Sequence, residues 1–341
     1  MRTVILNIPI EPIEDRYSVQ WDKWFQSAFH ENPDLELISV HGGVTSGSIR
    51  QGSFLDVIET NLYKNKQLDK ILHYLNTYKD DHKLILFFHD LWNPALTSIA
   101  YVRDGMGWKN LRICGCLHSG SYDKFDFLNK QGMTKWAARI EEGWCKIVDK
   151  IFVATHYHDI LLRSKRVLLD DWDKIVVTGF PLYDDFQQPH NIMDDESIPI
   201  IVFPHRLDSE KNPQMFDELK SRLPSYRFIK TKENCKTKES YYRLLKSSDV
   251  AVSFADQETW GIAMQEAVIC GALPMCPNRL SYTEMYPSAF LFENFEECVN
   301  KIKWLLAHEN QANEFLQNTK NTILRKGREA IPNMIKEIEK L

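Results

Sequence analysis

Short apolar runs alternate with longer amphipathic segments along almost the whole chain. The apolar runs have the length of β-strands, and the amphipathic segments have the period of helices. In the first half we expect strands at 3–8, 35–40, 84–88, 111–117, 150–154 and 174–178, with helices at 20–29, 69–79, 134–148 and 158–169. A β-α-β alternation of this kind is typical of parallel sheets with helices on both faces.

The alternation is interrupted at residues 184–199, which are acidic and lack apolar periodicity. We interpret them as a linker between an N-terminal Rossmann-like domain at 1–183 and a C-terminal one at 200–341. The second domain is expected to have strands at 198–203, 226–230, 249–254, 272–276 and 291–292 and helices at 213–222, 238–247, 259–270, 295–308, 311–328 and 331–341. The last helix either stays there or returns to the first domain. Two such α/β domains would face each other across a cleft.

Charge and composition exclude some classes of function. Lys and Arg number 42 and Asp and Glu 47, a net charge of −5, which argues against a basic protein that coats nucleic acid but allows a local basic groove. No apolar run approaches the ~20 residues that span a bilayer, so we expect no membrane contact. The seven cysteines indicate free thiols in a reducing cytoplasm. Cys114 and Cys116 alone make no four-ligand metal site.

The segment 248–280 has the sharpest site pattern. An apolar strand runs into the polar turn 255–258, and a helix is expected to begin at Thr259. The N–H groups that begin such a helix form an anion site at the carboxyl end of the strand. Gly261 would let a phosphate or a sugar approach the backbone closely.

Two glutamates, Glu258 and Glu266, stand eight residues apart in this segment. On a helix this spacing places the carboxylates near one side and ~12 Å apart along the axis. That distance is too long for an acid–base pair but suits two contacts with one long ligand. The alternative is a helix-capping Glu258 and a solvent-facing Glu266. However, Glu266 stands among apolar residues, where a carboxylate needs a partner.

The segment 200–213 carries two cations. Its apolar strand ends near residue 203, and Arg206 and Lys211 follow before the next helix. A planar guanidinium and a compact ammonium together suit a diphosphate. Taken alone, two cations in a loop are also consistent with a solvated surface.

Arg206 and Lys211, followed by Glu258 and Glu266, resemble the donor site of retaining glycosyltransferases of family 4. Residues 174–186 (KIVVTGFPLYDDF) resemble the end of that family's first domain. The resemblance implies the GT-B fold, with two facing Rossmann-like domains. It also implies an enzyme that uses a nucleotide-sugar donor, a UDP-sugar in preference to a GDP-sugar, with no metal or other cofactor.

The resemblance also assigns roles within the second domain. Arg206 and Lys211 would hold the donor's diphosphate and stabilise the leaving group during catalysis. Glu258 would bind the hydroxyls of the donor sugar, and Glu266 would bind the ribose of the nucleotide. The donor site would be completed by Thr259 and the backbone amides of Trp260, Gly261 and Ile262.

Several stretches of the second domain, among them WGIAMQEAV and CPNRLSYTEMYP, are similar to tRNA-queuosine mannosyltransferases. They are also similar to phage glycosyltransferases that modify hydroxymethylated pyrimidines in DNA. Both groups act on a hydroxyl of a modified nucleobase. The start of the chain, NIPIEPIEDRYSVQW, resembles the phage proteins.

We therefore favour transfer of a hexose or pentose to 5-hydroxymethylpyrimidine, such as hydroxymethylcytosine, in bacteriophage DNA within the host cytoplasm. Queuosine in tRNA is the alternative acceptor, and a glycan or lipid-linked acceptor comes third. A non-catalytic module that binds nucleic acid or sugar is the alternative from another class. No oligomeric state is predicted.

The first domain offers candidates for the acceptor side. His118 follows the strand at 111–117, where a catalytic histidine of the family would lie beside the donor sugar; the alternative is a polar loop histidine. His89, Asp90 and Trp92 follow the strand at 84–88. A His–Asp pair there could deprotonate an acceptor hydroxyl, or it could be a structural pair.

Nucleic-acid contacts are expected around Trp108. Arg103 precedes it, and Lys109 and Arg112 follow it. Cations around an aromatic ring suit phosphates together with a stacked or flipped base. The alternative is a run of solvated charges.

Overall fold

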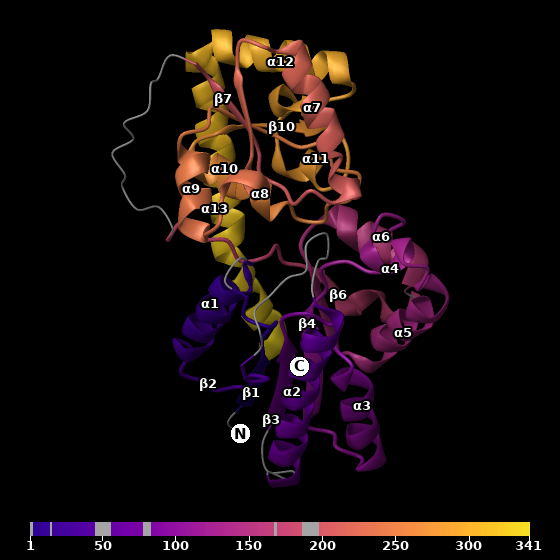
Figure 1. The fold of residues 1–341 in the computed structure, drawn as a ribbon. Coiled ribbons are helices and arrows are strands. Elements are labelled where there is room, and N and C mark those ends of the chain that lie inside the picture. The colour runs from indigo at the N-terminus through magenta and orange to yellow at the C-terminus, as the bar shows by residue number, and fades with distance from the viewer. Residues whose placement is uncertain (1–2, 14–15, 45–55, 78–82, 167–168, 186–197) are drawn as a thin grey trace. The chain divides into compact units, whose positions relative to one another are not determined.

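The computed structural model describes residues 3–13, 16–44, 56–77, 83–166, 169–185 and 198–341. The chain forms two compact units: Met1–Pro181 with Glu329–Leu341, and Leu182–Arg328. Each unit contains its own parallel sheet (Figure 1). The expected α/β class with two β/α domains is confirmed, whereas the expected linker at 184–199 lies mostly outside the described residues.

The first unit contains a six-stranded parallel sheet in the order β2-β1-β3-β4-β5-β6. The order reverses direction between β1 and β3, and open α/β sheets bind ligands at such a switch point. The strands are β1 (Thr3–Ile8), β2 (Leu35–Ser39), β3 (Lys83–Phe88), β4 (Leu111–Cys116), β5 (Lys150–Val153) and β6 (Ile175–Val177). The helices are α1 (Ser18–His30), α2 (Val57–Thr77), α3 (Ala95–Gly105), α4 (Phe127–Lys130), α5 (Thr134–Ile147), α6 (His156–Arg166) and the 3-10 helix η1 (Leu169–Lys174).

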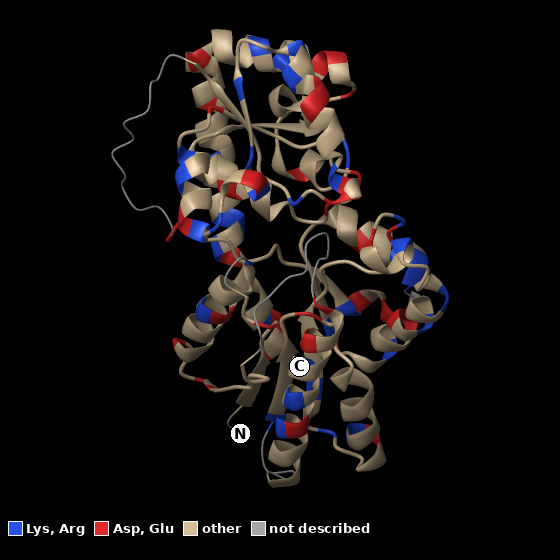
Figure 2. Cartoon of the chain, viewed as in Figure 1, with Lys and Arg blue, Asp and Glu red and all other residues tan. Residues whose placement is uncertain are grey.

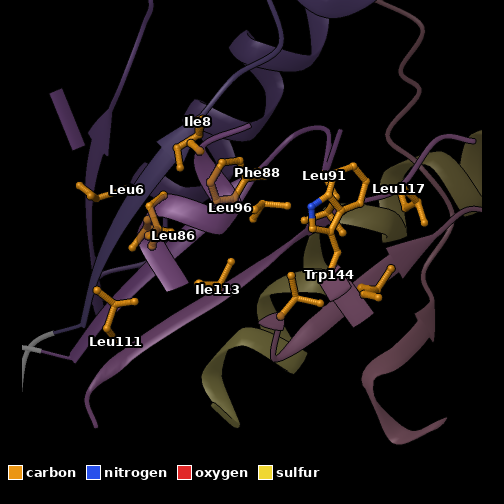
Figure 3. Packing of buried hydrophobic residues seen from close by; sticks show 14 of the residues in the cluster. Leu6, Ile8, Leu86, Phe88, Leu91, Leu96, Leu111, Ile113, Leu117 and Trp144 are labelled. Carbon is orange, nitrogen blue, oxygen red and sulfur yellow. The ribbon is translucent and has the colours of Figure 1, made fainter. Parts of the chain in front are cut away.

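Alternate positions of neighbouring strands fill the core of the first unit. Leu6 and Ile8 of β1 share a cluster with Leu86 and Phe88 of β3, and Trp144 of α5 joins them (Figure 3). Residues two apart on a strand point to the same face, so each strand contributes a row of apolar side chains. This packing holds the strand ends, and therefore the loops that follow them, in register.

The second unit contains a five-stranded parallel sheet in the order β11-β10-β9-β7-β8. Here the order reverses between β7 and β9. The strands are β7 (Ile200–Phe203), β8 (Arg227–Lys230), β9 (Val250–Val252), β10 (Leu273–Pro277) and β11 (Leu291–Phe292). The helices are η2 (Ser209–Lys211), α7 (Pro213–Arg222), α8 (Thr231–Asn234), α9 (Lys238–Lys246), α10 (Ile262–Cys270), α11 (Tyr282–Met285), η3 (Ser288–Phe290), α12 (Phe295–Ala307) and α13 (Glu309–Glu339).

The expected strands lie within two residues of those observed, but several helices differ. The helix α3 was not expected. The helix α2 begins at Val57 rather than at 69, and α10 begins at Ile262 rather than at Thr259.

The helices expected at 311–328 and 331–341 are wrong, because α13 is one helix with Pro332 inside it. Proline removes a backbone donor and disfavours a helix interior. Ile331, Met334 and Ile338 lie at helical spacing on either side of this proline and are all 0% exposed. Tertiary packing of this apolar face outweighs the local cost. The division between the two compact units falls inside this helix.

Candidate functional site

The candidate site lies in two loops of the second unit. These loops follow β7 and β9, the two strands between which the order of the second sheet reverses. The loop after β7 carries Arg206 and Lys211, and the loop after β9 carries Glu258. The strands β7 and β9 pair in parallel, so their carboxyl ends and both loops lie at one edge of the sheet. This is the edge at which an open α/β sheet binds a ligand.

Side-chain and backbone hydrogen bonds tie the two loops together. Asn212 has a left-handed backbone (φ 52°), and its Nδ2 donates to the carbonyl of Phe254 at 2.9 Å and to Asp256 Oδ2 at 2.8 Å. The N–H of Asp256 donates to the carbonyl of Glu210 at 2.8 Å. The cations of one loop are therefore fixed relative to the carboxylate of the other. Sequence reasoning missed Asn212 and Asp256.

Lys211 and Glu258 form a buried ion pair at this edge. Lys211 Nζ donates to Glu258 Oε2 at 3.2 Å and to the carbonyl of Gln257 at 2.5 Å. Burial raises the pKa of Glu258, but the charge of Lys211 and the hydrogen bonds from Lys211 and the N–H of Gly261 leave it below its ordinary value. An ammonium has three donors. One N–H of Lys211 remains for a ligand beside a carboxylate that stays ionised.

Arg206 is held by acids of its own loop. Its Nε lies 2.6 Å from Asp208 Oδ2, and its Nη2 lies 2.6 Å from Glu210 Oε1. The side chain is 36% exposed, and a guanidinium has five donors. Arg206 is therefore oriented and still able to bind an anion.

His205 was missed by sequence reasoning. It is 4% exposed, and its Nε2 has no hydrogen-bond partner among the described residues. Burial, together with a smaller effect of the Lys211 charge, lowers the pKa of His205 to about 3. The imidazole is therefore neutral, and it adds no charge to the Lys211–Glu258 pair.

Gly261 marks the point at which the loop after β9 becomes α10. Its φ of 79° is left-handed, and its N–H donates to Glu258 Oε1 at 2.9 Å. This bond holds the second oxygen of Glu258. The Gly261 amide therefore stays a predicted part of the phosphate cradle, although in this structure its N–H is bound to Glu258. Thr259, Trp260 and Gly261 precede the helix rather than begin it.

Gly261→Ala is expected to weaken nucleotide binding about tenfold or more. A left-handed backbone costs a non-glycine residue roughly 1–2 kcal/mol, and the new Cβ would lie 3.3 Å from Tyr282 Cε1 and 3.5 Å from Glu258 Cγ. Calorimetric titration with nucleoside diphosphates measures the effect. Gly271→Ala is the matched control, since its φ of 108° is also left-handed but its Cβ meets nothing within 4 Å. Equal losses of affinity in both variants would contradict a local role for Gly261.

Glu266 lies in α10 and is 3% exposed. We expected this carboxylate to have a partner, and it has three. It accepts hydrogen bonds from the hydroxyls of Tyr241 and Tyr242 and from the ammonium of Lys238. These residues belong to α9. The spacing of Glu258 and Glu266 in the sequence does not indicate these three partners.

His118 lies two residues after the end of β4 in the first unit. Its Nε2 donates to the carbonyl of His89 at 2.8 Å, and its Nδ1 accepts from the hydroxyl of Tyr17 at 3.2 Å. Burial lowers the pKa of His118, although Asp90 and the hydrogen bond to the carbonyl of His89 oppose this. Both nitrogens of a neutral imidazole are therefore occupied.

His89 and Asp90 do not form the expected pair. His89 is 0% exposed and its Nε2 lies 2.7 Å from Asn7 Oδ1, while Asp90 Oδ1 accepts from the N–H of Trp92 at 3.1 Å. Burial lowers the pKa of His89 to about 3. A base for an acceptor hydroxyl must reach that hydroxyl, and His89 is enclosed. Trp92 packs edge-on against Trp144.

The expected nucleic-acid contacts at Arg103 and Trp108 are wrong. Trp108 is 6% exposed and belongs to the core of the first unit, so it offers no ring face to a base. Arg103 Nη1 donates to the carbonyl of Ile147 at 3.0 Å and lies 3.6 Å from Asp149. In both units Lys and Arg are interspersed with Asp and Glu along the helices (Figure 2).

The described part of the chain contains no group of three or more His, Cys, Asp or Glu side chains placed to hold a metal ion. Within the same residues, no helix has the length and apolar character needed to cross a membrane. All seven cysteines are free thiols.

Solved structures define the class of fold. No protein-family model matches the chain. Sucrose-phosphate synthase from Thermosynechococcus elongatus aligns with a TM-score of 0.73 at 11% identity, over 100% of this chain and 98% of that one. The UDP-forming α,α-trehalose-phosphate synthase from Burkholderia vietnamiensis aligns with a TM-score of 0.66 at 10% identity, over 100% of both chains. These are glycosyltransferases of the GT-B type, and the chain has the GT-B fold.

One similarity in sequence is more specific. The chain is 27% identical over 135 residues to the tRNA-queuosine alpha-mannosyltransferase of Drosophila melanogaster. The match covers 32% of this chain and 36% of that protein, so the chain spans about a third of the length of this relative.

Proposed function

We propose that the chain is a retaining glycosyltransferase that takes a sugar from a nucleotide-sugar donor. The observation that carries this is the buried Lys211–Glu258 pair beside Arg206 at the switch point of the second sheet. The GT-B fold of the similar structures and the mannosyltransferase relative support it.

Lys211, Arg206 and Glu258 bind different parts of the donor. The remaining N–H of Lys211 and the guanidinium of Arg206 bind the diphosphate and stabilise the charge that develops as the leaving group departs. Here these cations take the part that a metal plays in other transferases. A carboxylate offers about four lone-pair positions. Glu258 uses two, for Lys211 and Gly261, and keeps two for sugar hydroxyls.

The acceptor attacks with its hydroxyl on the face from which the diphosphate departs, which gives retention at the anomeric carbon. We place the acceptor beside the first unit's strand ends, near Asp90 and His118. His118 has both nitrogens occupied, so its part is to position Tyr17 and the backbone of His89.

We infer that the acceptor is a hydroxyl on a modified nucleobase. The mannosyltransferase relative favours queuosine in tRNA. The phage-like start of the chain keeps 5-hydroxymethylpyrimidine in DNA as the second candidate.

A transfer assay read by mass spectrometry tests the proposal. The protein is incubated with a panel of UDP-, GDP- and ADP-sugars and with queuosine tRNA or DNA containing 5-hydroxymethylcytosine, and the digested nucleosides are weighed. We expect the mass of one hexose or pentose to be added to queuosine or to the pyrimidine. Tight nucleic-acid binding without consumption of any donor would instead indicate a non-catalytic module.

A further inference from the structure

His205 has a buried imidazole whose Nε2 has no hydrogen-bond partner among the described residues. The residue lies two positions after the end of β7 and is 4% exposed. Its ring packs against that of Phe203 at an interplanar angle of 70°, with the ring centres 5.2 Å apart. Burying a polar atom without a partner costs free energy, and few such atoms occur in native structures. This nitrogen is held in a fixed orientation and is available to a ligand.

The imidazole lies among the charged side chains of the candidate site. After burial, the charges with the largest effect on the pKa of His205 are those of Lys211 and Glu258, ahead of that of Arg206, its neighbour in the chain. Electrostatic effects fall with distance. The ring of His205 is therefore close to the Lys211–Glu258 ion pair.

The protonation state of His205 limits what it can bind. Burial, with a smaller effect of the Lys211 charge, lowers its pKa to about 3, so the ring is neutral near pH 7. A neutral imidazole donates through one nitrogen and accepts through the other. His205 can therefore offer a directed N–H group without placing a third positive charge beside Lys211 and Arg206.

The positive charges at this edge are already offset by carboxylates. Lys211 pairs with Glu258 at 3.2 Å. Arg206 lies 2.6 Å from Asp208 and 2.6 Å from Glu210. Two cations therefore face three carboxylates. An anion bound here depends on N–H groups that point at it, rather than on a surplus of positive charge.

We propose that His205 is a further diphosphate-binding residue, and that its Nε2–H donates to an oxygen of the phosphate that carries the sugar. This phosphate is chosen because the ring lies beside Glu258, which we assign to the sugar. The phosphate oxygens of a nucleotide sugar are ionised and accept hydrogen bonds, so the contact selects the tautomer with its proton on Nε2. This inference rests on the proposed function, because it takes the Lys211–Glu258 edge as the diphosphate site.

The contact also has a part in the reaction. Negative charge develops on this phosphate as the bond to the sugar breaks. A neutral N–H donor that is already oriented stabilises that charge without transferring its proton.

Two competing accounts predict other outcomes for His205→Leu. If His205 only fills the core, leucine removes an unpaired polar atom, so stability is kept or rises and nucleotide affinity does not change. If His205 only supports its loop, leucine lowers stability and weakens all nucleotides equally. A contact with the diphosphate predicts a third pattern, in which stability is kept or rises while the affinity for diphosphates falls.

Calorimetric titration and thermal unfolding distinguish these patterns. UDP, GDP and ADP are titrated into the native chain, and the tightest is then compared with its monophosphate. In His205→Leu we expect the affinity for the diphosphate to fall about tenfold to hundredfold, the range for a hydrogen bond to a charged group. The affinity for the monophosphate should change less than about twofold, and the melting temperature should stay the same or rise.

Two amide variants test the position of the donor. Glutamine places an N–H group near the position of Nε2, so His205→Gln should keep most of the diphosphate affinity. Asparagine reaches only the position of Nδ1, so His205→Asn should lose it. His205→Asn carries the same test if His205→Leu does not fold. His308→Leu, at an exposed position of the second unit, is the matched control and should bind like the native chain.

The outcomes that contradict the proposal are distinct. An unchanged diphosphate affinity in folded His205→Leu, or equal losses for the diphosphate and the monophosphate, would overturn this inference alone. No binding of any nucleoside diphosphate by the native chain would overturn the proposed function with it.

Discussion

Lys211→Met is expected to lower donor turnover by about 10²–10³-fold, the range for removal of one preorganised donor at a developing charge. Two N–H groups of Lys211 are bound by Gln257 and Glu258, and we assign the third to the diphosphate. Methionine keeps the apolar stem of the side chain but has no hydrogen-bond donor. The rate of nucleoside diphosphate release measures the effect.

The same change leaves Glu258 buried without its cation, so the free energy of unfolding is expected to fall by about 3–5 kcal/mol. The double variant Lys211→Met/Glu258→Gln removes both charges and should recover much of the stability, but none of the turnover. Lys220→Met, at an exposed position of α7, should change neither. Recovered turnover in the double variant would show that Lys211 acts only on the fold.

Glu141→Ala is expected to destabilise the first unit strongly. Glu141 is 2% exposed and accepts from the N–H and the hydroxyl of Ser121 at 2.6 and 2.7 Å and from Arg166 Nε at 2.6 Å. The alanine would leave Arg166, itself 9% exposed, without a counter-charge. Breaking a buried pair in this way costs about 3–5 kcal/mol.

That loss corresponds to a fall in melting temperature of about 6–20 °C for a unit of this size. Thermal unfolding followed by circular dichroism measures it. The neighbouring residue provides the control: Glu142 is 40% exposed and pairs with Arg139 at the surface, so Glu142→Ala should cost less than about 1 kcal/mol. Equal shifts in the two variants would mean that the Glu141 network does not stabilise the loop that carries Ser121.

The central strands could be predicted because they are short apolar runs buried on both faces. Residues of β7 and β9 are at most 8% exposed, and parallel strands covered by helices show this continuous pattern. The helix α3 escaped prediction because its sequence, ALTSIAYVRDG, contains β-branched residues of low helix propensity. Only its buried face, with Ala95, Leu96, Ile99 and Ala100, shows the helical period.

The donor side of the site was predictable as a set of residues but not as a set of contacts. Arg206, Lys211 and Glu258 follow strand ends that the apolar runs identify, so their common edge could be inferred. The partners of Glu266 could not, because they stand 24 to 28 residues away on α9. Only the packing of α9 against α10 brings them together.

Charge patterns alone misled on the acceptor side. Trp108 with its neighbouring cations has the pattern of a nucleic-acid contact, yet the ring is buried in the core. A run of residues does not distinguish an aromatic ring that faces solvent from one that faces a sheet. The prediction for His89 failed for the same reason. A residue at the end of a strand can be a ligand-binding residue or part of the core, and His89 is buried.

Consumption of nucleotide sugars by the purified protein tests the central claim most directly. The native chain and Glu258→Ala are incubated with the same panel of UDP-, GDP- and ADP-sugars, with and without acceptor, and the released nucleoside diphosphate is measured. We predict that the native chain consumes at least one donor and that Glu258→Ala loses this activity by at least about 10²-fold. Equal consumption by both proteins, or none by the native chain, would contradict the assignment of the Lys211–Glu258 edge as a donor site.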